Sequence, residues 1–517
     1  MAKDRLTEVL ERWEPVIGLE IHTEVTATKT KMFCGCEVAF GGEPNTRVCP
    51  VCLGMPGALP VPNRAAVEWT VLAGLATGCD IASWSQFHRK NYFYPDMPKN
   101  YQISQYDLPF CSDGSVHIEV TEDGVNERID RESAPRVILT PAGYATEIGI
   151  TRIHLEEDTG KMVHVGGSEG RIAGATKSLV DFNRAGTALM ELVSEPDIRT
   201  PEEARRFAQK LRLIWLTLGV SDCNMEEGSM RVDANVSVRP RGTEPFGTKS
   251  EIKNMNSFKA LHDAIAYEIV RQAELIESGG TVVQETRHWD ATAKVTSGLR
   301  SKEEAHDYRY FPEPDMVPFE FSQEYVSAIY ERLPELPDAR KARFVEGWGI
   351  PSIDAETLVS DLALADYFEA AVAAAGDEAA KQVSNIVLND LSAYLNASGV
   401  TPTDSVVTPA HIAELIGLLE DGTISSKQAK EVFAAVAESG SAPAAIVAER
   451  GMKQVSDTGA IEEVVDRLMA ANPDKVAEYR AGKTGLIGFF VGQVMRETGG
   501  QANPGVVNQV LTERLQG

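Results

Sequence analysis

Four of the seven cysteines fall in one short segment, FCGCEVAFGGEPNTRVCPVCLG, residues 33–54. They form two closely spaced pairs, Cys34 with Cys36 and Cys49 with Cys52. A structural zinc ion takes four ligands, with sulfur at about 2.3 Å, and two tight turns commonly supply them. The segment therefore predicts a zinc site whose four positions are all filled by protein, so that the metal serves the fold. Two alternatives stay open: four reduced thiols without a metal, and a redox pair at Cys49 and Cys52.

A second set of chemically capable residues follows from strand geometry, because residues i and i+2 of a strand share a face. In VIGLEIHTEV the polar residues Glu20 and His22 lie opposite the apolar Ile17, Leu19 and Ile21. Three further predicted strands repeat this arrangement, and their polar faces carry Arg152, His154 and Glu156, then Asp181 and Asn183, then Arg231, Asp233 and Asn235.

Carboxylates and imidazoles gathered with arginine and asparagine are typical of a divalent-cation site that handles phosphates. The alternative is the solvated face of a half-covered sheet, although such faces usually carry lysine, threonine and glutamate. Glu156 and Glu157 are adjacent, so in an extended strand their side chains diverge. If both serve one site, the strand must end or bulge there, and residues 158–160 offer a turn.

The stretch FHRKNYFYPDMPKNYQISQY, residues 87–106, interleaves aromatic residues with Arg89, Lys90 and Lys99. Aromatic and basic groups together can stack bases and hold phosphates. The alternative is an ordered loop that packs its aromatic side chains into the core.

The strands and helices predicted from the sequence, which must position these residues, indicate an α+β protein. A chain of 517 residues is too long for one core. The first 300 or so residues read as strands with intervening helices, such as residues 201–216 and 257–278. The composition changes near residue 320, and the later residues read as helices rich in alanine, leucine and glutamate. We expect a β-rich domain over residues 1–320, a helical domain over 321–404 and a helical tail over 405–517, with a linker at 402–409.

The bulk composition restricts location and partners. The net charge is −26, which disfavours a generally basic nucleic-acid surface but leaves room for a local basic patch. The first residues lack the apolar segment of a signal peptide, and no run reaches the roughly 20 apolar residues of a membrane span. The sequence therefore predicts a cytoplasmic protein without membrane contact, where disulfides rarely persist.

Eight segments in fixed order make the sequence resemble a known family. They are GLEIH, CPVCLGMPGALPVPN, RKNYFYPDMPKNYQISQ, RIHLEEDTGK, VDFNRAGTALMELVSEPDI, MEEGSMRVDANVSV, EIKNMNSF and YRYFPEPD. Together they resemble the GatB family, the B subunits of aspartyl/glutamyl-tRNA(Asn/Gln) amidotransferases. The likeness starts near residue 15 and is specific as far as Asp315. The related GatE proteins carry an inserted domain for which this chain leaves no room, so the GatB type fits better.

That resemblance implies a cradle-shaped catalytic domain, a helical domain and a helical tail that binds tRNA. It implies ATP-dependent phosphorylation of the side-chain carboxylate of Glu-tRNA(Gln) or Asp-tRNA(Asn), followed by amidation with ammonia. The ammonia comes from an amidase A subunit, and a small C subunit completes a heterotrimer. The cofactors implied are Mg²⁺ and Zn²⁺, with ATP as a substrate. Which misacylated tRNA is used depends on the synthetases of the cell.

The resemblance also implies roles for individual residues. Catalytic roles fall to Glu20, His22, Glu156, Glu157, Asp181 and Asp233, and the first four of these are the expected magnesium ligands. Lys90, Lys99 and Arg231 are assigned to the ammonia path or to substrate binding. Lys427, Lys430 and Lys483 are the expected tRNA-binding residues of the tail. The four clustered cysteines match a zinc set that occurs in some members of the family.

From the residues alone, two other classes stay open. A two-metal phosphoesterase or nuclease would use the same acidic groups and would release phosphate from nucleic acid without ATP. A tRNA-binding scaffold would need no metal and would show no ATP turnover. No segment offers an activated cysteine glutaminase or a Ser-Ser-Lys amidase signature, so glutamine hydrolysis is expected to belong to a partner.

Overall fold

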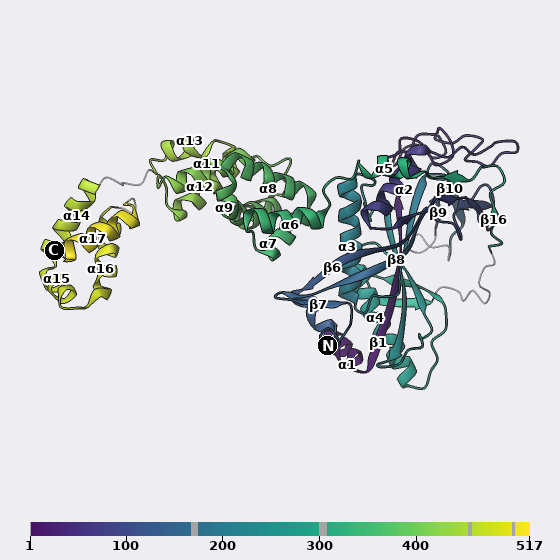
Figure 1. Cartoon of the computed structure of the whole chain (residues 1–517), viewed down its shortest axis with the longest axis horizontal. Helices are drawn as coiled ribbons and strands as arrows, with labels where there is room; N and C mark the ends of the chain where they lie inside the picture. Colours follow the sequence, from purple (N-terminus) through teal and green to yellow (C-terminus); the bar gives the residue numbers. More distant parts are fainter. Residues whose placement is uncertain (1, 167–173, 299–307, 453–457, 499–501, 517) are drawn as a thin grey trace. The chain divides into compact units, whose positions relative to one another are not determined.

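The computed structural model describes residues 2–166, 174–298, 308–452, 458–498 and 502–516. These residues form two compact units, 1–336 and 337–517. The first unit combines sheets with helices, from purple to teal in Figure 1, and the second is helical, from green to yellow. The α+β prediction is confirmed.

A large sheet organises the first unit, and ten of the described strands belong to it. In spatial order it contains β15 (Val295–Gly298), β14 (Thr286–Asp290), β13 (Ser250–Met255), β12 (Met230–Pro240), β1 (Trp13–Glu24), β11 (Ala188–Ser194), β8 (Gly143–Glu157), β6 (Cys111–Thr121) and β2 (Asp80–Ile81), while β7 (Val137–Thr140) pairs with β8. Neighbouring strands are antiparallel except β13 and β14. The long central strands β1 and β8 are visible in Figure 1.

One face of this sheet is covered by helices. They are α1 (Ala2–Arg12), α2 (Arg64–Ala76), α3 (Pro201–Leu218) and α4 (Phe258–Glu277), and together with the sheet they enclose one apolar core. The helix α3 packs on β6 and α4 packs on β12. As the alternation of β1 predicts, Ile17, Leu19 and Ile21 are almost fully buried in this core. Glu20 and His22 therefore face the opposite side of the sheet.

The sequence places the ends of the two longest helices accurately. The side chain of Thr200 accepts a hydrogen bond from the Glu203 N–H, and Pro201 occupies the first turn of α3. The helix stops at Gly219, whose φ of +74° suits glycine. Ser257 caps α4 in the same way as Thr200 caps α3.

Smaller sheets surround one end of the large one. They pair β9 (Lys161–Val165) with β10 (Lys177–Asp181), β4 (His88–Asn91) with both β5 (Tyr101–Ser104) and β16 (Phe311–Pro312), and β3 (Trp84–Ser85) with β17 (Phe319–Glu320). The unit continues through α5 (Gln323–Tyr330), which packs on α2. Because Phe321 and Ile329 belong to the first core, this unit ends later than the expected boundary at residue 320.

The second unit contains two separate apolar cores among its described residues. The first spans residues 344–447, and its helices are α6 (Pro337–Trp348), α7 (Ser352–Val359), α8 (Leu362–Ala375), α9 (Ala380–Ile386), α10 (Ser392–Ser398), α11 (Pro409–Glu420), α12 (Ser426–Ser439) and α13 (Pro443–Glu449). The second spans residues 461–515, with α14 (Thr458–Ala471), α15 (Pro473–Arg480), α16 (Ile487–Glu497) and α17 (Pro504–Gln516).

The expected division at residues 404 and 405 falls inside the first of these cores. The segment 402–409 is a tight connection whose Val407 is buried, and the Tyr367 hydroxyl donates to the Val407 carbonyl at 2.8 Å. Because α11 packs on α8, the helices before and after this segment share one core. Across the described residues no single helix is long and apolar enough to cross a membrane, and one bent pair, α12 with α13, meets that test on length and composition alone.

A buried ion pair ties α3 to the sheet and generates a stability prediction. Glu203 is fully buried, and it accepts hydrogen bonds from Arg128 at 2.9 Å and from the Tyr144 hydroxyl at 3.1 Å. Removing one partner of such a pair leaves an uncompensated buried charge. Glu203→Ala should therefore destabilise the first unit by about 3–5 kcal/mol and lower its urea midpoint.

The control is Glu8→Ala, which removes an exposed pair with Arg5 in the same unit. Solvent screens that pair, so the control should shift the urea midpoint far less. Equal shifts in the two variants would contradict the prediction.

Candidate functional site

The face of the large sheet opposite the helices borders a cavity of about 970 Å³. Strand register puts a row of polar side chains across four neighbouring strands at its floor. His154 of β8 lies opposite Glu191 of β11, Glu191 lies opposite His22 of β1, and His22 lies opposite Arg231 of β12. Three of the four polar faces predicted from the sequence, those of β8, β1 and β12, thus lie on one surface, and β11 adds Glu191 to it.

Glu191 is the centre of this row. Its Oε2 lies 3.3 Å from Nε2 of His22 and 3.3 Å from Nε2 of His154, and its side chain is only 7% exposed. Burial by itself would raise the pKa of Glu191, but the two imidazoles outweigh burial and hold that pKa well below its usual range. Burial by itself would lower the pKa of His154. The negative charges of Glu191 and Glu156 outweigh burial and raise this pKa to about 9.

Two groups of side chains in the cavity place their ligand atoms close enough to hold a metal ion. The first contains Glu20, His22 and Asp233, and the second contains His22, Glu156 and Glu191. Within each group the ligand atoms lie within 4.8 Å of one another. Because His22 belongs to both, the two groups form one continuous acidic cluster. Burial and then the Glu191 charge raise the pKa of Glu20, although the charges of His22 and Lys253 oppose the shift.

Basic side chains line the same cavity. Lys253 of β13 contacts Asp233 and Glu251, and Arg231 contacts Asp158 at 2.7 Å. Burial lowers the pKa of Lys90, yet the carboxylates of Glu156 and Glu191 more than compensate and raise it above its ordinary value. Lys90 is therefore held as a cation beside the acidic cluster. A site with both signs of charge can bind a phosphate and a metal ion together.

The structure separates Glu157 from Glu156. Strand β8 stays extended through Glu157 without the turn or bulge that a shared site would require, so the two side chains point to opposite faces. Glu156 accepts from the Ser104 hydroxyl at 2.8 Å and lines the cavity. Glu157 forms a buried ion pair with Lys99 and accepts from the Ile103 N–H at 2.9 Å, and neither Glu157 nor Lys99 lines the cavity.

Asp181 also lies outside the cavity. It ends β10, which pairs with β9 in a separate two-stranded sheet. Its Oδ1 accepts hydrogen bonds from the N–H groups of Asn45, at 2.9 Å, and Asn183, at 3.0 Å. Asp181 therefore fastens the cysteine-rich loop to β10. Of the six residues assigned to catalysis, the structure gathers Glu20, His22, Glu156 and Asp233, and it places Glu157 and Asp181 elsewhere.

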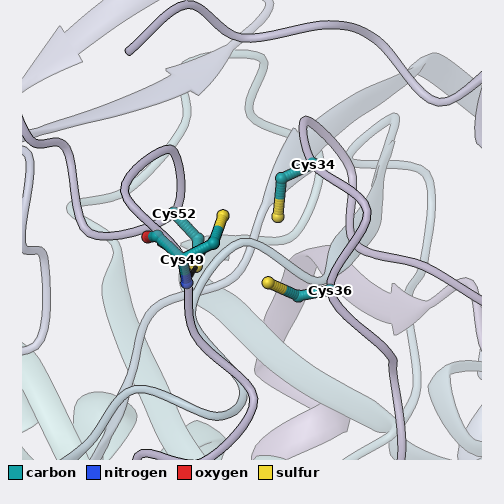
Figure 2. A group of neighbouring side chains, drawn as sticks. All are labelled: Cys34, Cys36, Cys49 and Cys52. Atoms are coloured by element: carbon teal, nitrogen blue, oxygen red, sulfur yellow. Dashed lines mark hydrogen bonds between the residues drawn. The ribbon is translucent and has the colours of Figure 1, made fainter. Parts of the chain in front are cut away.

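The four clustered cysteines come together from two turns, and Figure 2 shows their sulfur atoms facing a common space. The four Sγ atoms all lie within 4.8 Å of one another, and those of Cys49 and Cys52 are 3.9 Å apart. Sulfur atoms about 2.3 Å from one tetrahedral metal ion would be roughly 3.8 Å apart. The Cys52 sulfur accepts from the Cys49 N–H at 3.1 Å and from Lys31 at 3.7 Å.

The electrostatics of this cysteine group favour a thiolate. Contact with the Cys34 thiol lowers the pKa of Cys52 to about 4, helped by the Cys49 N–H and the Lys31 charge. Burial raises the pKa of Cys36 to about 11. The Cys52 thiol is thus ready to ionise, and Cys36 would need a cation at the centre to do so.

The lysines expected to bind tRNA lie in different parts of the second unit. Lys427 and Lys430 are exposed on α12, one of the helices that enclose the apolar core of residues 344–447. Lys483 follows α15, one of the helices around the apolar core of residues 461–515. Its side chain pairs with Glu478 at 3.1 Å. Only Lys427 and Lys430 share an element.

The sequence interpretation gave no role to four charged residues of the cavity, Asp158, Glu191, Glu251 and Lys253. A signal was present for Glu191, since it is the one charged residue of ALMELVS, an apolar strand buried almost throughout. A lone glutamate at such a position needs a buried partner. Glu251 and Lys253 alternate along EIKNM with Ile252 in the core, so the period-two argument could have found them too.

Comparison with known proteins agrees with this geometry. The family model described as the GatB/GatE catalytic domain matches residues 15–327, which include every element around the cavity. The model described as the GatB domain matches residues 366–515. The chain belongs to the GatB family. The resemblance inferred from the eight sequence segments is thereby confirmed.

Curated relatives of this GatB chain match it along nearly its whole length. A protein of Carboxydothermus hydrogenoformans, named as the B subunit of aspartyl/glutamyl-tRNA(Asn/Gln) amidotransferase, is 52% identical over 506 residues, covering 98% of this chain and 99% of the relative. Proteins with the same name from Moorella thermoacetica and Synechococcus elongatus are 52% and 50% identical, over 503 and 509 residues. The first of these two matches covers 97% of this chain and 100% of the relative, and the second covers 98% of this chain and 99% of the relative.

The shared contact of Glu191 with two imidazoles predicts a titration shift. Glu191→Gln removes the largest influence that raises the pKa of His154, so this pKa should fall from about 9 toward its ordinary value. NMR titration of the metal-free protein labelled in histidine measures the change, with His154→Asn assigning the signal. Glu251→Gln, which does not contact His154, is the control. An unchanged His154 pKa in Glu191→Gln would contradict the described row.

Proposed function

We propose that this chain is the subunit of a tRNA-dependent amidotransferase that activates the side-chain carboxylate of Glu-tRNA(Gln) or Asp-tRNA(Asn) with ATP. The observation that carries the proposal is the acidic cluster of Glu20, His22, Glu156, Glu191 and Asp233, with Lys90 held as a cation against it. Family membership and the names of the relatives support the substrate class.

The reaction balances in two steps. A side-chain carboxylate oxygen attacks the γ-phosphorus of ATP, the bond from that phosphorus to the β,γ-bridging oxygen breaks, and ADP leaves. Ammonia then attacks the acyl carbon, its surplus proton passes to a base or water, and inorganic phosphate leaves. Lys90 and Arg231 provide positive charge at the cavity wall, where they can balance the transferring phosphoryl group.

The donor set fits magnesium, because Mg²⁺ prefers carboxylate oxygens and keeps its sites open to substrate phosphates. Glu20, His22 and Asp233 would hold one ion, and Glu156 and Glu191 border the same position. Bound there, magnesium would neutralise charge on the phosphates of ATP. The chain's own carboxylates set the place of the ion, and His22 lies between Glu20 and Glu191, with its Nε2 at 3.5 Å and 3.3 Å from their oxygens.

The remaining assignments extend the same proposal. Following the family resemblance, we propose that ammonia comes from an amidase A subunit, with a small C subunit completing a heterotrimer. The described cysteines outside the cluster (Cys79, Cys111 and Cys223) are buried and their thiols have raised pKa values, which supports a source of ammonia outside this chain. Burial suppresses the thiolate that a glutaminase needs. Lys99 and Glu157 lie behind the cavity floor on the side of the cysteine loop, where a path for ammonia would be screened from the acidic cluster. Lys427, Lys430 and Lys483 of the helical unit are proposed contacts for tRNA phosphates.

Substitutions in the acidic cluster test the proposal. Glu20→Gln and His22→Ala should each lower tRNA-dependent ATP turnover of the reconstituted complex by about 100-fold. Affinity for tRNA should change less than about threefold, because it comes from many phosphate contacts on a wider surface. Turnover is followed as ADP release, and tRNA binding by filter retention.

Glu157→Gln is the informative comparison, since Glu157 is a neighbour in sequence that faces away from the cavity. Its effect on ATP turnover should be smaller than that of Glu20→Gln. ATP turnover that survives Glu20→Gln, or phosphate release from tRNA without ATP, would overturn the assignment.

We also propose that Cys34, Cys36, Cys49 and Cys52 hold one structural zinc ion. Four thiolates around one ion form a closed site, so the metal would contribute to folding rather than to chemistry. Elemental analysis of protein purified without chelator should find about one zinc per chain. Cys36→Ser should lose the zinc and loosen the 33–54 loop to proteolysis, whereas Cys79→Ser should keep the zinc. Four freely titratable thiols in the folded wild type would contradict the site.

A further inference from the structure

Three tyrosines line the cavity, and none of them has a role in the proposed chemistry. They are Tyr106, which follows β5, and Tyr308 and Tyr310, which precede β16. We call them the tyrosine cluster. Although about 200 positions separate Tyr106 from the other two, β4 pairs with both β5 and β16 and so brings them together. The Asn91 N–H donates to the Tyr308 carbonyl at 2.9 Å and fixes the segment.

The cluster contains a parallel aromatic stack at the rim of the cavity. The rings of Tyr106 and Tyr310 are 4.4 Å apart at their centroids and inclined by only 16°. Tyr308 meets Tyr310 edge to face at 6.1 Å. Tyr106 is 58% exposed and does not belong to the apolar core of the unit. The Tyr106 ring also lies edge to face with the His88 ring, at 6.3 Å between centroids. The stack is therefore largely exposed at the rim rather than filling the interior.

The inner side of the cluster faces the charged part of the cavity. Nζ of Lys90 lies 5.1 Å from the centroid of the Tyr308 ring. Burial and the Glu156 charge raise the pKa of Tyr310 to about 12, although Lys90 opposes the shift. From inside to outside, the cavity thus offers carboxylates, a lysine and then aromatic rings.

This order matches the chemistry of a nucleotide. A cation held by the carboxylates and the Lys90 ammonium suit phosphates, and exposed aromatic rings suit a base, because every base has a face that stacks. We propose that the Tyr106–Tyr310 stack is the platform for an adenine base of the substrate. The inference rests on the proposed function, in which ATP and the 3′-terminal adenosine of tRNA both carry adenine.

A fluorescent base distinguishes the two sources of adenine. The fluorescence of 2-aminopurine falls when the base stacks on an aromatic ring. One arm titrates the reconstituted complex with 2-aminopurine riboside triphosphate, and the other titrates it with tRNA that carries 2-aminopurine at the 3′ end. We expect quenching in one arm, and that arm identifies the source of the base. Absence of quenching in both arms, with binding shown by competition, would overturn the platform.

Variants of Tyr106 test the stack independently. Tyr106→Ala should abolish the quenching and raise KM for the matching substrate by about tenfold, with kcat at saturation within about twofold. Tyr106→Phe keeps the ring and should stay within about twofold of wild type in both constants. Tyr330→Ala, at a tyrosine of α5 that is 60% exposed and outside this cavity, is the matched control.

The outcomes separate this inference from the proposed function. A wild-type complex without tRNA-dependent ATP turnover would contradict the proposed function, whatever the Tyr106 variants do. An active wild type in which Tyr106→Ala leaves both KM values unchanged would contradict the platform alone. Equal damage from Tyr106→Phe and Tyr106→Ala would assign the effect to the hydroxyl group and would also overturn stacking.

Discussion

The carboxylate of Glu191, shared between His22 and His154, is the interaction on which the cavity depends. It lies on β11, between the two strands that supply the imidazoles, and it is almost completely buried. A buried carboxylate is stable only when other groups balance its charge, and here two imidazoles do so by contacting the same oxygen. Glu20 and Glu156 belong to two different groups of possible metal ligands, and His22 is common to both groups.

The same mutual support extends outward through the basic residues. Lys253 lies against Asp233, and Arg231 lies against Asp158, so the acidic surface carries its own counter-charges up to the edge of the cavity. A substrate phosphate with a divalent cation can enter such a mixed field, because the cation is drawn to the carboxylates and the phosphate to the lysine and arginine side chains. Selectivity then depends on geometry rather than on the net charge of −26.

The sequence predicted the fold class, the central strand and both long helices because these follow from local rules. Alternation placed Ile17, Leu19 and Ile21 inside, and Thr200 and Ser257 capped their helices as their type suggests. Four cysteines in two turns were brought together as their spacing implied. The turn at 402–409, with a proline at each end, resembles a linker in sequence, although the helices on its two sides share one apolar core.

The differences between the expected and the observed positions of the site residues have a different cause. Whether Asp181 enters the cavity depends on which strand β10 pairs with, and pairing is set by long-range contacts that no local pattern contains. Glu191 was overlooked because it interrupts an apolar strand and so reads as an exception rather than as a member of a polar face. The stack of Tyr106 on Tyr310 joins two segments far apart in the chain, which only the three-dimensional structure brings together.

The two glutamates at the end of β8 show how strictly this strand is constrained in length. Glu156 faces the cavity, whereas Glu157 is sealed behind it with Lys99. Strand β8 is 15 residues long. One residue inserted or deleted before Glu156 would turn Glu156 away from the cavity and Glu157 toward it, and would turn the His154 side chain toward the core. The composition of the strand would hardly change, yet both environments would be lost. The spacing of residues along β8 therefore determines both environments as much as the identity of the residues does.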